Sequence, residues 1–181
     1  MNLVQGKVWK FEDNINTNLL MPTFTYENVA TKVPEEQLKN YCMYTERPDF
    51  SKNVKRGDVV VGGKNFGCGS SRPAAKNLLA LGISCVLAES VAAIFFRNSI
   101  NLGLPVVSIH GVSALFREGD IAQVNLSTGK IENLTAGGML RAQPVHELLM
   151  RILESGGIIP YLKKEASEGR LFERSIPPDC K

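Results

Sequence analysis

Glycine, serine and arginine are concentrated in residues 62–72, which read Gly-Gly-Lys-Asn-Phe-Gly-Cys-Gly-Ser-Ser-Arg. Glycines let the backbone adopt a positive φ or approach a ligand closely, and Arg72 can form two parallel hydrogen bonds to a carboxylate. If a helix begins at Pro73, then Ser70, Ser71 and Arg72 lie at its amino end, where unpaired N–H groups and the helix dipole favour an anion. The segment therefore predicts a carboxylate-binding site. A turn with a serine N-cap is the alternative that the spacing leaves open.

The elements around this segment must bring it to one edge of a sheet. We expect a buried strand ending at residues 58–61, a helix over 73–81, a strand at 85–88, a helix over 91–102 capped by Ser90, and a strand at 105–108. This order is typical of a parallel α/β unit, in which ligands collect at the carboxyl ends of strands. A hairpin at 121–134 and a helix over 145–154 follow.

Two nucleotide-binding motifs can be compared with the same segment. Gly62 and Gly67 have the glycine separation of a P-loop, but the next residues are Cys68 and Gly69 where that motif needs Lys and then Ser or Thr. A dinucleotide fingerprint beginning at Gly67 would need a small residue where Arg72 stands. The segment therefore does not predict a nucleotide site.

Three segments together carry a resemblance to a known family. They are Asn65-Phe66-Gly67-Cys68-Gly69-Ser70-Ser71-Arg72, the stretch 89–106 (ESVAAIFFRNSINLGLPV) and the stretch 13–22 (DNINTNLLMP). In this order they resemble the small subunit of 3-isopropylmalate dehydratase, which is equivalent to the swivel domain of aconitase. The resemblance runs from about Gly6 to about Leu162. It implies an α/β fold, the swivelling β/β/α domain, over residues 1–162, followed by a C-terminal tail at 163–181 that packs on the domain or a partner.

The resemblance also implies a function. It predicts one half of a hydro-lyase that isomerises 2-isopropylmalate and 3-isopropylmalate by dehydration and rehydration, a step of leucine biosynthesis. A separate large subunit would hold a [4Fe-4S] cluster, and this chain would bind no cofactor itself. Ser70 would be the base, although the assignment between Ser70 and Ser71 stays open. Ser71 and Arg72, with the loop backbone at Gly69, would hold carboxylate oxygens of a 2-hydroxy acid.

The chain departs from the family at positions near these residues. Pro73 and Ala74 replace the usual Glu-His or Glu-Gln after the arginine, and Asn16-Thr17-Asn18 replaces the usual Asp-Thr-Asp. Residues 24–26, Phe24, Thr25 and Tyr26, fall where relatives carry a loop that reads the side group of the substrate. The aromatic rings there could line an alkyl pocket or pack in the core. No cation lies in this stretch, which favours an alkyl-malate over a tricarboxylate.

Alternatives from the same and from another class remain. The chain could be the small subunit of a related hydratase, such as 2,3-dimethylmalate dehydratase or homoaconitase. It could instead be a non-catalytic regulatory module that binds carboxylates. The identity of the substrate depends on the assembled site.

Composition narrows the class of protein. The 181 residues are 44% hydrophobic and 22% charged with a formal charge of +3, which is ordinary for one globular domain. The basic residues are dispersed, so nucleic acid is not an expected partner, and no segment predicts a membrane span or a signal peptide. We therefore expect a cytoplasmic protein that forms a heterodimer or larger assembly with its large subunit, or a homo-oligomer when isolated. The four cysteines lack metal-ligand spacing, and we expect Cys68 to be a structural residue of the loop, with a reactive thiol beside Arg72 as the alternative.

Overall fold

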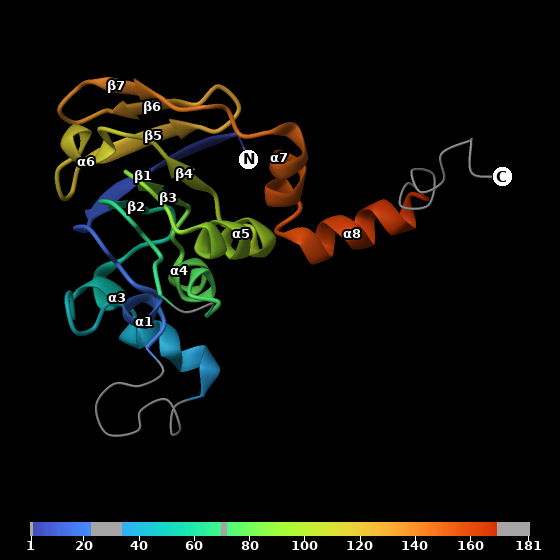
Figure 1. The fold of residues 1–181 in the computed structure, drawn as a ribbon, viewed down its shortest axis with the longest axis horizontal. Helices are drawn as coiled ribbons and strands as arrows, with labels where there is room; N and C mark the ends of the chain where they lie inside the picture. Colours follow the sequence, from blue (N-terminus) through green and yellow to red (C-terminus); the bar gives the residue numbers. More distant parts are fainter. Residues whose placement is uncertain (1, 23–33, 70–71, 170–181) are drawn as a thin grey trace.

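The computed structural model describes residues 2–22, 34–69 and 72–169. Its centre is one seven-stranded sheet with the order β4-β3-β2-β1-β5-β6-β7 (Figure 1). The strands are β1 Leu3–Lys10, β2 Val59–Gly62, β3 Cys85–Ala88, β4 Val106–Ser108, β5 Ile121–Asn125, β6 Lys130–Asn133 and β7 Met139–Arg141.

Strand β1 joins two halves of different type. It pairs in parallel with β2 and antiparallel with β5. The pairs β2–β3 and β3–β4 are parallel, whereas β5–β6 and β6–β7 are antiparallel. The predicted parallel unit and the predicted hairpin are therefore confirmed, and β1 and β7 are additional strands that the sequence analysis did not predict.

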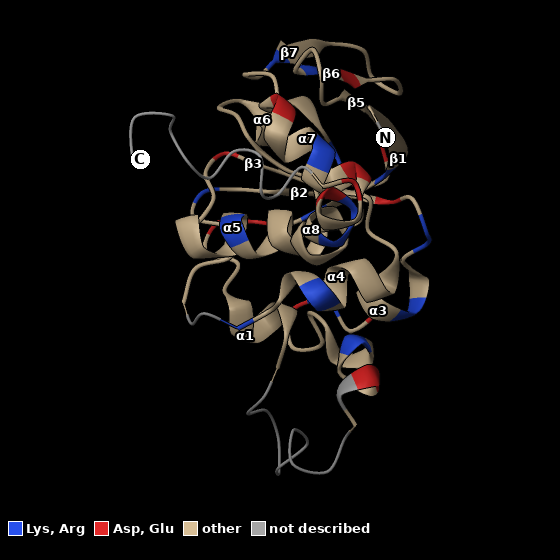
Figure 2. Ribbon diagram, turned by 90° about the vertical axis from the view of Figure 1, so that its right-hand side faces the viewer, with Lys and Arg blue, Asp and Glu red and all other residues tan. Residues whose placement is uncertain are grey.

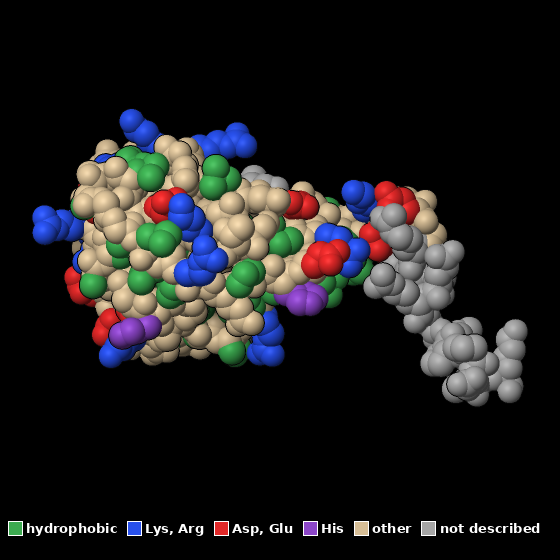
Figure 3. All heavy atoms as spheres, turned by 90° about the horizontal axis from the view of Figure 1, so that it is seen from above, with side chains coloured by type: hydrophobic (Ala, Val, Ile, Leu, Met, Phe, Trp, Pro, Cys, Tyr) green, Lys and Arg blue, Asp and Glu red, His purple; other side chains and the backbone are tan. Residues whose placement is uncertain are grey.

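Helices cover the parallel half and one end of the sheet (Figure 1). Helices α4 and α5 lie below the sheet, and α8 extends away from the body of the protein (Figures 1 and 3). The helices are α1 Thr17–Leu20, the 3-10 helix η1 Glu35–Tyr41, α3 Phe50–Asn53, α4 Ala75–Leu81, α5 Ala93–Leu102, α6 Val112–Leu115, α7 Glu147–Glu154 and α8 Ile158–Ser167.

Both faces of the parallel strands are buried, because the antiparallel strands curl over the face that α4 and α5 leave open. Within β2, Val60 belongs to the core under α4 and α5, whereas Val59 and Val61 belong to the core that β5, β6 and α7 enclose. Residues of a strand point alternately to opposite faces, so each strand contributes to both cores. Two buried faces explain why β2 and β3 are continuous apolar runs.

Three predicted helix starts differ from the structure by two residues. Helix α4 begins at Ala75 where the prediction was 73, α5 begins at Ala93 where it was 91, and α7 begins at Glu147 where it was 145. Helix α8 begins at Ile158, so the proposed division between a domain and a tail at 162 and 163 falls inside a helix. That division stays a prediction.

Neither the charged nor the hydrophobic side chains form a dominant patch in the two views shown. Lys and Arg alternate with Asp and Glu over the helices in Figure 2, and the hydrophobic side chains form small separate patches in Figure 3. Within the described part of the chain, no helix combines the length and the apolar character that crossing a membrane requires.

Candidate active site

The three motif segments meet at the carboxyl ends of β1, β2 and β3. Beyond the sheet, residues 63–69 run between residues 13–18 and residues 89–92, with parallel bridges on each side. The Gly67 N–H donates to the Ile15 carbonyl at 2.7 Å. Parallel strands end at the same edge of a sheet, and here the loops continue that pairing by a few residues. Segments up to about 75 positions apart in the sequence therefore form one loop junction.

Glycine is required in the middle of this junction. Gly67 has a φ of +76° and Gly69 a φ of +95°, a region that side chains with a Cβ atom rarely adopt. A Cβ atom on Gly67 would overlap the ring of Phe95, which packs edge-on against Phe66 with ring centroids 5.5 Å apart. The loop therefore lies directly on the aromatic core under α5.

Side chains from the first motif hold the start of the loop. The Lys64 N–H donates to Asp13 Oδ1 at 2.6 Å, and the Asn14 N–H donates to the Lys64 carbonyl at 2.8 Å. Asp13 also lies so close to Gly63 that a side chain at 63 would collide with it. These contacts explain why the first motif begins with a carboxylate at Asp13 and why a glycine, Gly63, follows β2.

The departure at Asn16 has a structural explanation. Asn16 is the N-cap of α1, and its Oδ1 accepts the N–H groups of Asn18 and Leu19 at 2.9 and 3.0 Å. Asparagine and aspartate are comparable N-caps, so the cap does not require the negative charge that relatives carry. The substitution therefore changes the charge of the site while it leaves the local fold in place.

Arg72 lies next to the part of the loop that carries the predicted catalytic serine. Ser70 and Ser71 are outside the described residues, as are Phe24, Thr25 and Tyr26. Arg72 is half-buried, and its carbonyl accepts the Ala74 N–H at 2.8 Å in a turn before α4.

The predicted helix start at Pro73 is wrong. The first turn of α4 uses its N–H groups internally, since Lys76 N–H donates to the Pro73 carbonyl at 2.8 Å and Asn77 N–H to the Ala74 carbonyl at 3.2 Å. The buried Asn77 side chain then donates to the Leu20 carbonyl at 3.0 Å, which fixes α4 against α1. Arg72, with Gly69, therefore remains a candidate ligand for a carboxylate through its own side chain, without support from a free helix end.

Ser90 also differs from its predicted role. It does not cap α5, whose N-cap is Ala92 and has no side-chain cap bond. Its hydroxyl accepts the Asn65 N–H at 2.7 Å, and its carbonyl accepts the Phe66 N–H at 3.0 Å. Ser90 therefore fastens the third motif to the loop.

Glu89 is a residue of the site region to which the sequence analysis gave no role. Its carboxylate accepts the N–H groups of Gly111 and Ser113 at 2.8 Å each and lies 3.0 Å from His110 Nδ1. Burial opposes its charge, but the two N–H donors outweigh that effect and lower the pKa of Glu89 below its ordinary value. Its position directly after the buried strand β3 was the signal that could have identified it.

The cysteines do not form a metal site within the described residues. Cys42 and Cys85 are buried, and burial raises the pKa of both thiols, that of Cys85 to about 12. Cys68 Sγ lies 3.7 Å from the Asn14 carbonyl oxygen, so its contact joins two loops. The described chain contains no group of three His, Cys, Asp or Glu side chains arranged to hold a metal ion.

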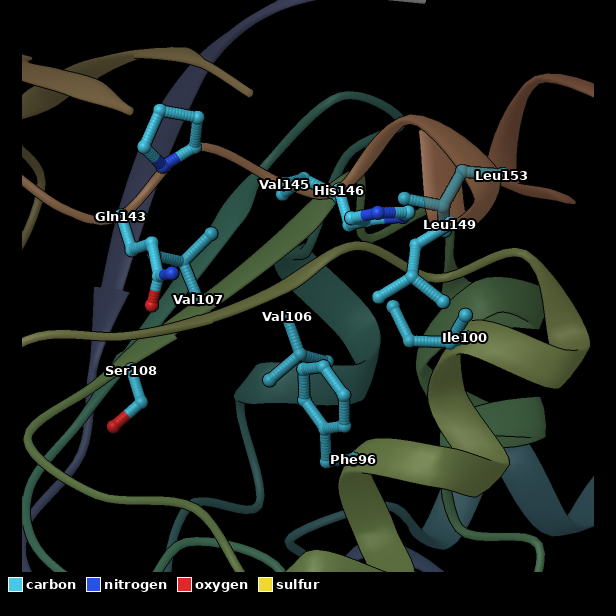
Figure 4. Close-up of a pocket in the computed structure, with 11 residues that line it drawn as sticks. Phe96, Ile100, Val106, Val107, Ser108, Gln143, Val145, His146, Leu149 and Leu153 are labelled. Carbon is cyan, nitrogen blue, oxygen red and sulfur yellow. The ribbon is translucent and has the colours of Figure 1, made fainter. Parts of the chain in front are cut away.

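The loop junction is open at Gly69 and Asn65, which are exposed, and a small pocket of about 90 Å³ lies beside it, lined by Asn16, Asn18 and Tyr44 among others. A cavity of about 290 Å³ lies elsewhere, between α5, β4 and α7, where Phe96, Val106 and Leu149 surround it (Figure 4). Neither Gly69 nor Arg72 lines that cavity. A substrate bound at the loop would therefore need another surface to enclose it.

Comparison with known proteins agrees with the geometry. The aconitase C-terminal domain family matches residues 6–110. The isopropylmalate/citramalate isomerase small subunit of Methanocaldococcus jannaschii is 51% identical over 93% of this chain and 99% of its own length. The 3-isopropylmalate dehydratase small subunit 1 of Methanopyrus kandleri is 44% identical over 95% and 98% of the two chains.

A solved structure supports the same assignment. The crystal structure of 3-isopropylmalate dehydratase (leuD) from Methanocaldococcus jannaschii superimposes with a TM-score of 0.82 at 33% identity, over 92% of this chain and 97% of that one. The loop junction and the curled sheet thus occur in a chain that belongs to the aconitase C-terminal domain family, among the small subunits of the 3-isopropylmalate dehydratase type.

Proposed function

We propose that this chain is the small subunit of a two-chain hydro-lyase that interconverts 2-isopropylmalate and 3-isopropylmalate by dehydration and rehydration, in leucine biosynthesis. The observation that carries the proposal is the loop junction, where three motif segments converge on one exposed edge. The names and near-complete coverage of the relatives support the same reaction. An enzyme of this type acts in the cytoplasm.

Residues 69–72 supply the proposed chemistry of this chain. Ser70 removes a proton from the carbon next to a substrate carboxylate, and Ser71 and Arg72 bind carboxylate oxygens. A serine hydroxyl is a weak base in water, so it needs nearby donors and a positive charge to stabilise the charge that develops. Arg72 provides that charge, and the positive φ of Gly69 turns the backbone immediately before Ser70.

The partner is a large subunit that covers this edge. An exposed loop cannot exclude water, whereas a second polypeptide can enclose the substrate and complete the site. We assign the [4Fe-4S] cluster to the large subunit, because the chain belongs to the aconitase family and its relatives are named as small subunits. When bound there, the cluster would supply an acceptor for the hydroxyl that leaves the substrate.

A wider substrate range is the second candidate. One relative is named for both isopropylmalate and citramalate, and the small subunit of a methanogen homoaconitase is 39% identical over 92% of this chain. Residues 24–26 contain no cation to bind a further carboxylate, which favours malates with an alkyl group over acids with a further carboxylate. We therefore rank citramalate and 2,3-dimethylmalate above homocitrate as additional substrates.

Anaerobic reconstitution with a cluster-bearing large subunit tests the proposal. We expect turnover of isopropylmalate by the mixture and none by either chain alone. Ser70→Ala should lower kcat by about 10³-fold while binding to the large subunit is retained. Ser127→Ala, in the exposed β5–β6 turn, is the matched control and should keep full activity.

Two other outcomes are informative. If the reconstituted enzyme turned over citramalate or 2,3-dimethylmalate but not isopropylmalate, the assigned substrate would change and the mechanism would stand. A firm complex with no turnover of any acid would overturn the proposal in favour of a regulatory module that binds carboxylates.

A further inference from the structure

Two neighbouring asparagines have an unusual backbone conformation. Asn14 has a φ of +61° and Asn65 a φ of +58°, in the left-handed region. Asparagine enters this region more readily than other side chains, but each such residue still costs about 1 kcal/mol. Asn65 Nδ2 donates to Asn14 Oδ1 at 3.0 Å, so the two unusual residues bind each other.

This amide pair lies at the point where the three motifs meet. The Asn14 N–H donates to the Lys64 carbonyl, next to Asn65, and the Asn65 N–H donates to the Ser90 hydroxyl. The pair therefore connects the first motif to the loop at the same residue that connects the loop to the third motif. Asn65 precedes Ser70 by only a few positions of a loop that is also held at Gly67.

Stability does not explain the choice of these residues. Both side chains are exposed, and an exposed hydrogen bond contributes about 0.5 kcal/mol or less. Glycine would adopt the same φ without strain. Two strained residues joined by a weak, exposed hydrogen bond indicate that the site requires this backbone geometry.

We propose that the Asn14–Asn65 amide pair is a positioning device that fixes the loop carrying Ser70 and Arg72 against the 13–18 loop. The inference rests on the proposed function for its role in catalysis, since the pair acts through the loop rather than on the substrate. Its direct physical effect is to keep the two loops in one register. Without it, the loop would sample orientations in which Ser70 and Arg72 do not point to the same substrate.

Removal of one or both amides gives a sharp test. Asn14→Asp and Asn65→Asp each leave one amide, which can donate to the new carboxylate, whereas the double variant Asn14→Asp/Asn65→Asp sets two carboxylates against each other without a donor. Aspartate tolerates the left-handed region, so all three variants keep the backbone. Asn14→Gly and Asn65→Gly remove the amide and keep the backbone. Asn125→Asp, whose Oδ1 accepts the Thr128 N–H in the antiparallel half, is the control.

In the reconstituted enzyme, we expect the double aspartate variant and both glycine variants to lower kcat about tenfold with little change in KM. Each single aspartate variant and Asn125→Asp should stay within about threefold of the unsubstituted chain. The glycine double variant should be no worse than either single variant, because one interaction is lost in each case. Melting temperatures should change by less than about 3 °C.

Hydrogen exchange in the isolated chain separates this inference from the proposed function. The Gly67 and Thr17 N–H groups bridge the two loops, and they should exchange about tenfold faster in the double aspartate variant than in either single aspartate variant. If no acid is turned over but this difference is found, the function fails and the positioning pair stands. Equal exchange and equal kcat in the double and the single aspartate variants would overturn the pair, as would a lowered melting temperature with unchanged kcat.

Discussion

The loop junction (residues 13–18, 63–69 and 89–92) and the antiparallel strands β5–β7 both rely on polar side chains, but these side chains differ in burial. In the loop junction, Asp13 and Asn65 are exposed and bind loop groups. In the antiparallel half, Asp120 and Asn133 are buried, and Asn133 Nδ2 donates to Asp120 Oδ2 at 2.7 Å. The exposed side chains of the loop junction fix the geometry of loops at the surface. The buried pair provides hydrogen-bond partners for polar groups inside the core.

The difference separates activity from stability along the chain. Loss of an exposed hydrogen bond costs little, whereas a buried group left without its partner costs about 1–3 kcal/mol. Changes to the exposed side chains of the loop junction should therefore affect turnover more than unfolding, and changes at Asp120 the reverse. Five experiments test this contrast.

The largest effect is expected for Arg72→Lys. A lysine keeps the charge but cannot form two parallel hydrogen bonds to a carboxylate, so kcat/KM should fall about 10³-fold. Steady-state kinetics of the reconstituted enzyme measures the change, and the melting temperature should stay within about 2 °C. Activity within tenfold of the unsubstituted chain would remove Arg72 from the site.

Gly67→Ala should cost about 2–4 kcal/mol of stability, because the new methyl group meets the Phe95 ring and the φ is positive. Activity should fall as well, since the loop must move. The matched control is Gly137→Ala before β7, where φ is +79° and no atom lies within 4 Å of the added group. The free energies of unfolding of the two variants, measured in urea, should differ by at least about 1 kcal/mol. Equal values would show that the positive φ, and not the contact with Phe95, causes the loss of stability.

Asp120→Ala should lower the free energy of unfolding by about 2–3 kcal/mol with unchanged kcat per folded molecule. The substitution removes the acceptor of the Arg117 N–H and one of the two acceptors of the Asn133 amide, which keeps the Leu115 carbonyl. Denaturant unfolding and active-site titration together measure both quantities. A loss of kcat comparable to that of Arg72→Lys would break the separation of the two regions.

Asn16→Ala should cost about 1 kcal/mol, because the cap of α1 is lost, whereas Asn16→Asp should leave stability unchanged. Since Asn16 borders the loop, kinetics with isopropylmalate and citramalate should accompany the unfolding curves. If Asn16→Asp lowered the free energy of unfolding as much as Asn16→Ala, the added negative charge, and not the helix cap, would determine stability at this position.

The smallest effect concerns pH. Hydrogen bonds from the Arg117 N–H and the Asn133 amide lower the pKa of Asp120, as the Gly111 and Ser113 N–H groups lower that of Glu89 against the effect of burial. A lowered folded-state pKa means that the stabilisation is complete above about pH 5 and is lost as the pH falls below about 4. Urea midpoints from pH 3 to 6 should fall less steeply for Asp120→Asn, and an unchanged slope would contradict the assignment.

The sequence predicted the parts of the fold whose pattern is strong. Apolar runs at β2 and β3 marked buried parallel strands, and the turn at 126–129 marked the hairpin. The sequence also predicted that residues 62–72 follow the carboxyl end of a buried parallel strand, and β2 ends at Gly62. That the other two motifs meet this loop is a finding of the structure. The roles of Ser70 and Ser71 stay predictions, since they lie outside the described residues.

Other features could not be predicted because their cause is tertiary. β1 contains a glycine and two lysines, and it is a strand because it lies between β2 and β5. Pro73 suits the first turn of a helix, but the turn from Arg72 to Ala74 delays the start of α4. Ser90 suits an N-cap, yet its hydroxyl is taken by Asn65. In each case a distant partner outweighs a local preference.

The central place of β1 has a consequence for synthesis of the chain. Val4 in β1 pairs with Val124 in β5, about 120 residues later. At about 5–20 residues per second, the first strand leaves the ribosome about 6–24 s before that partner exists. Throughout this interval one of its edges lacks its native partner, which makes it available to other chains. The strand that organises the finished sheet is therefore the one that must be protected for longest during translation.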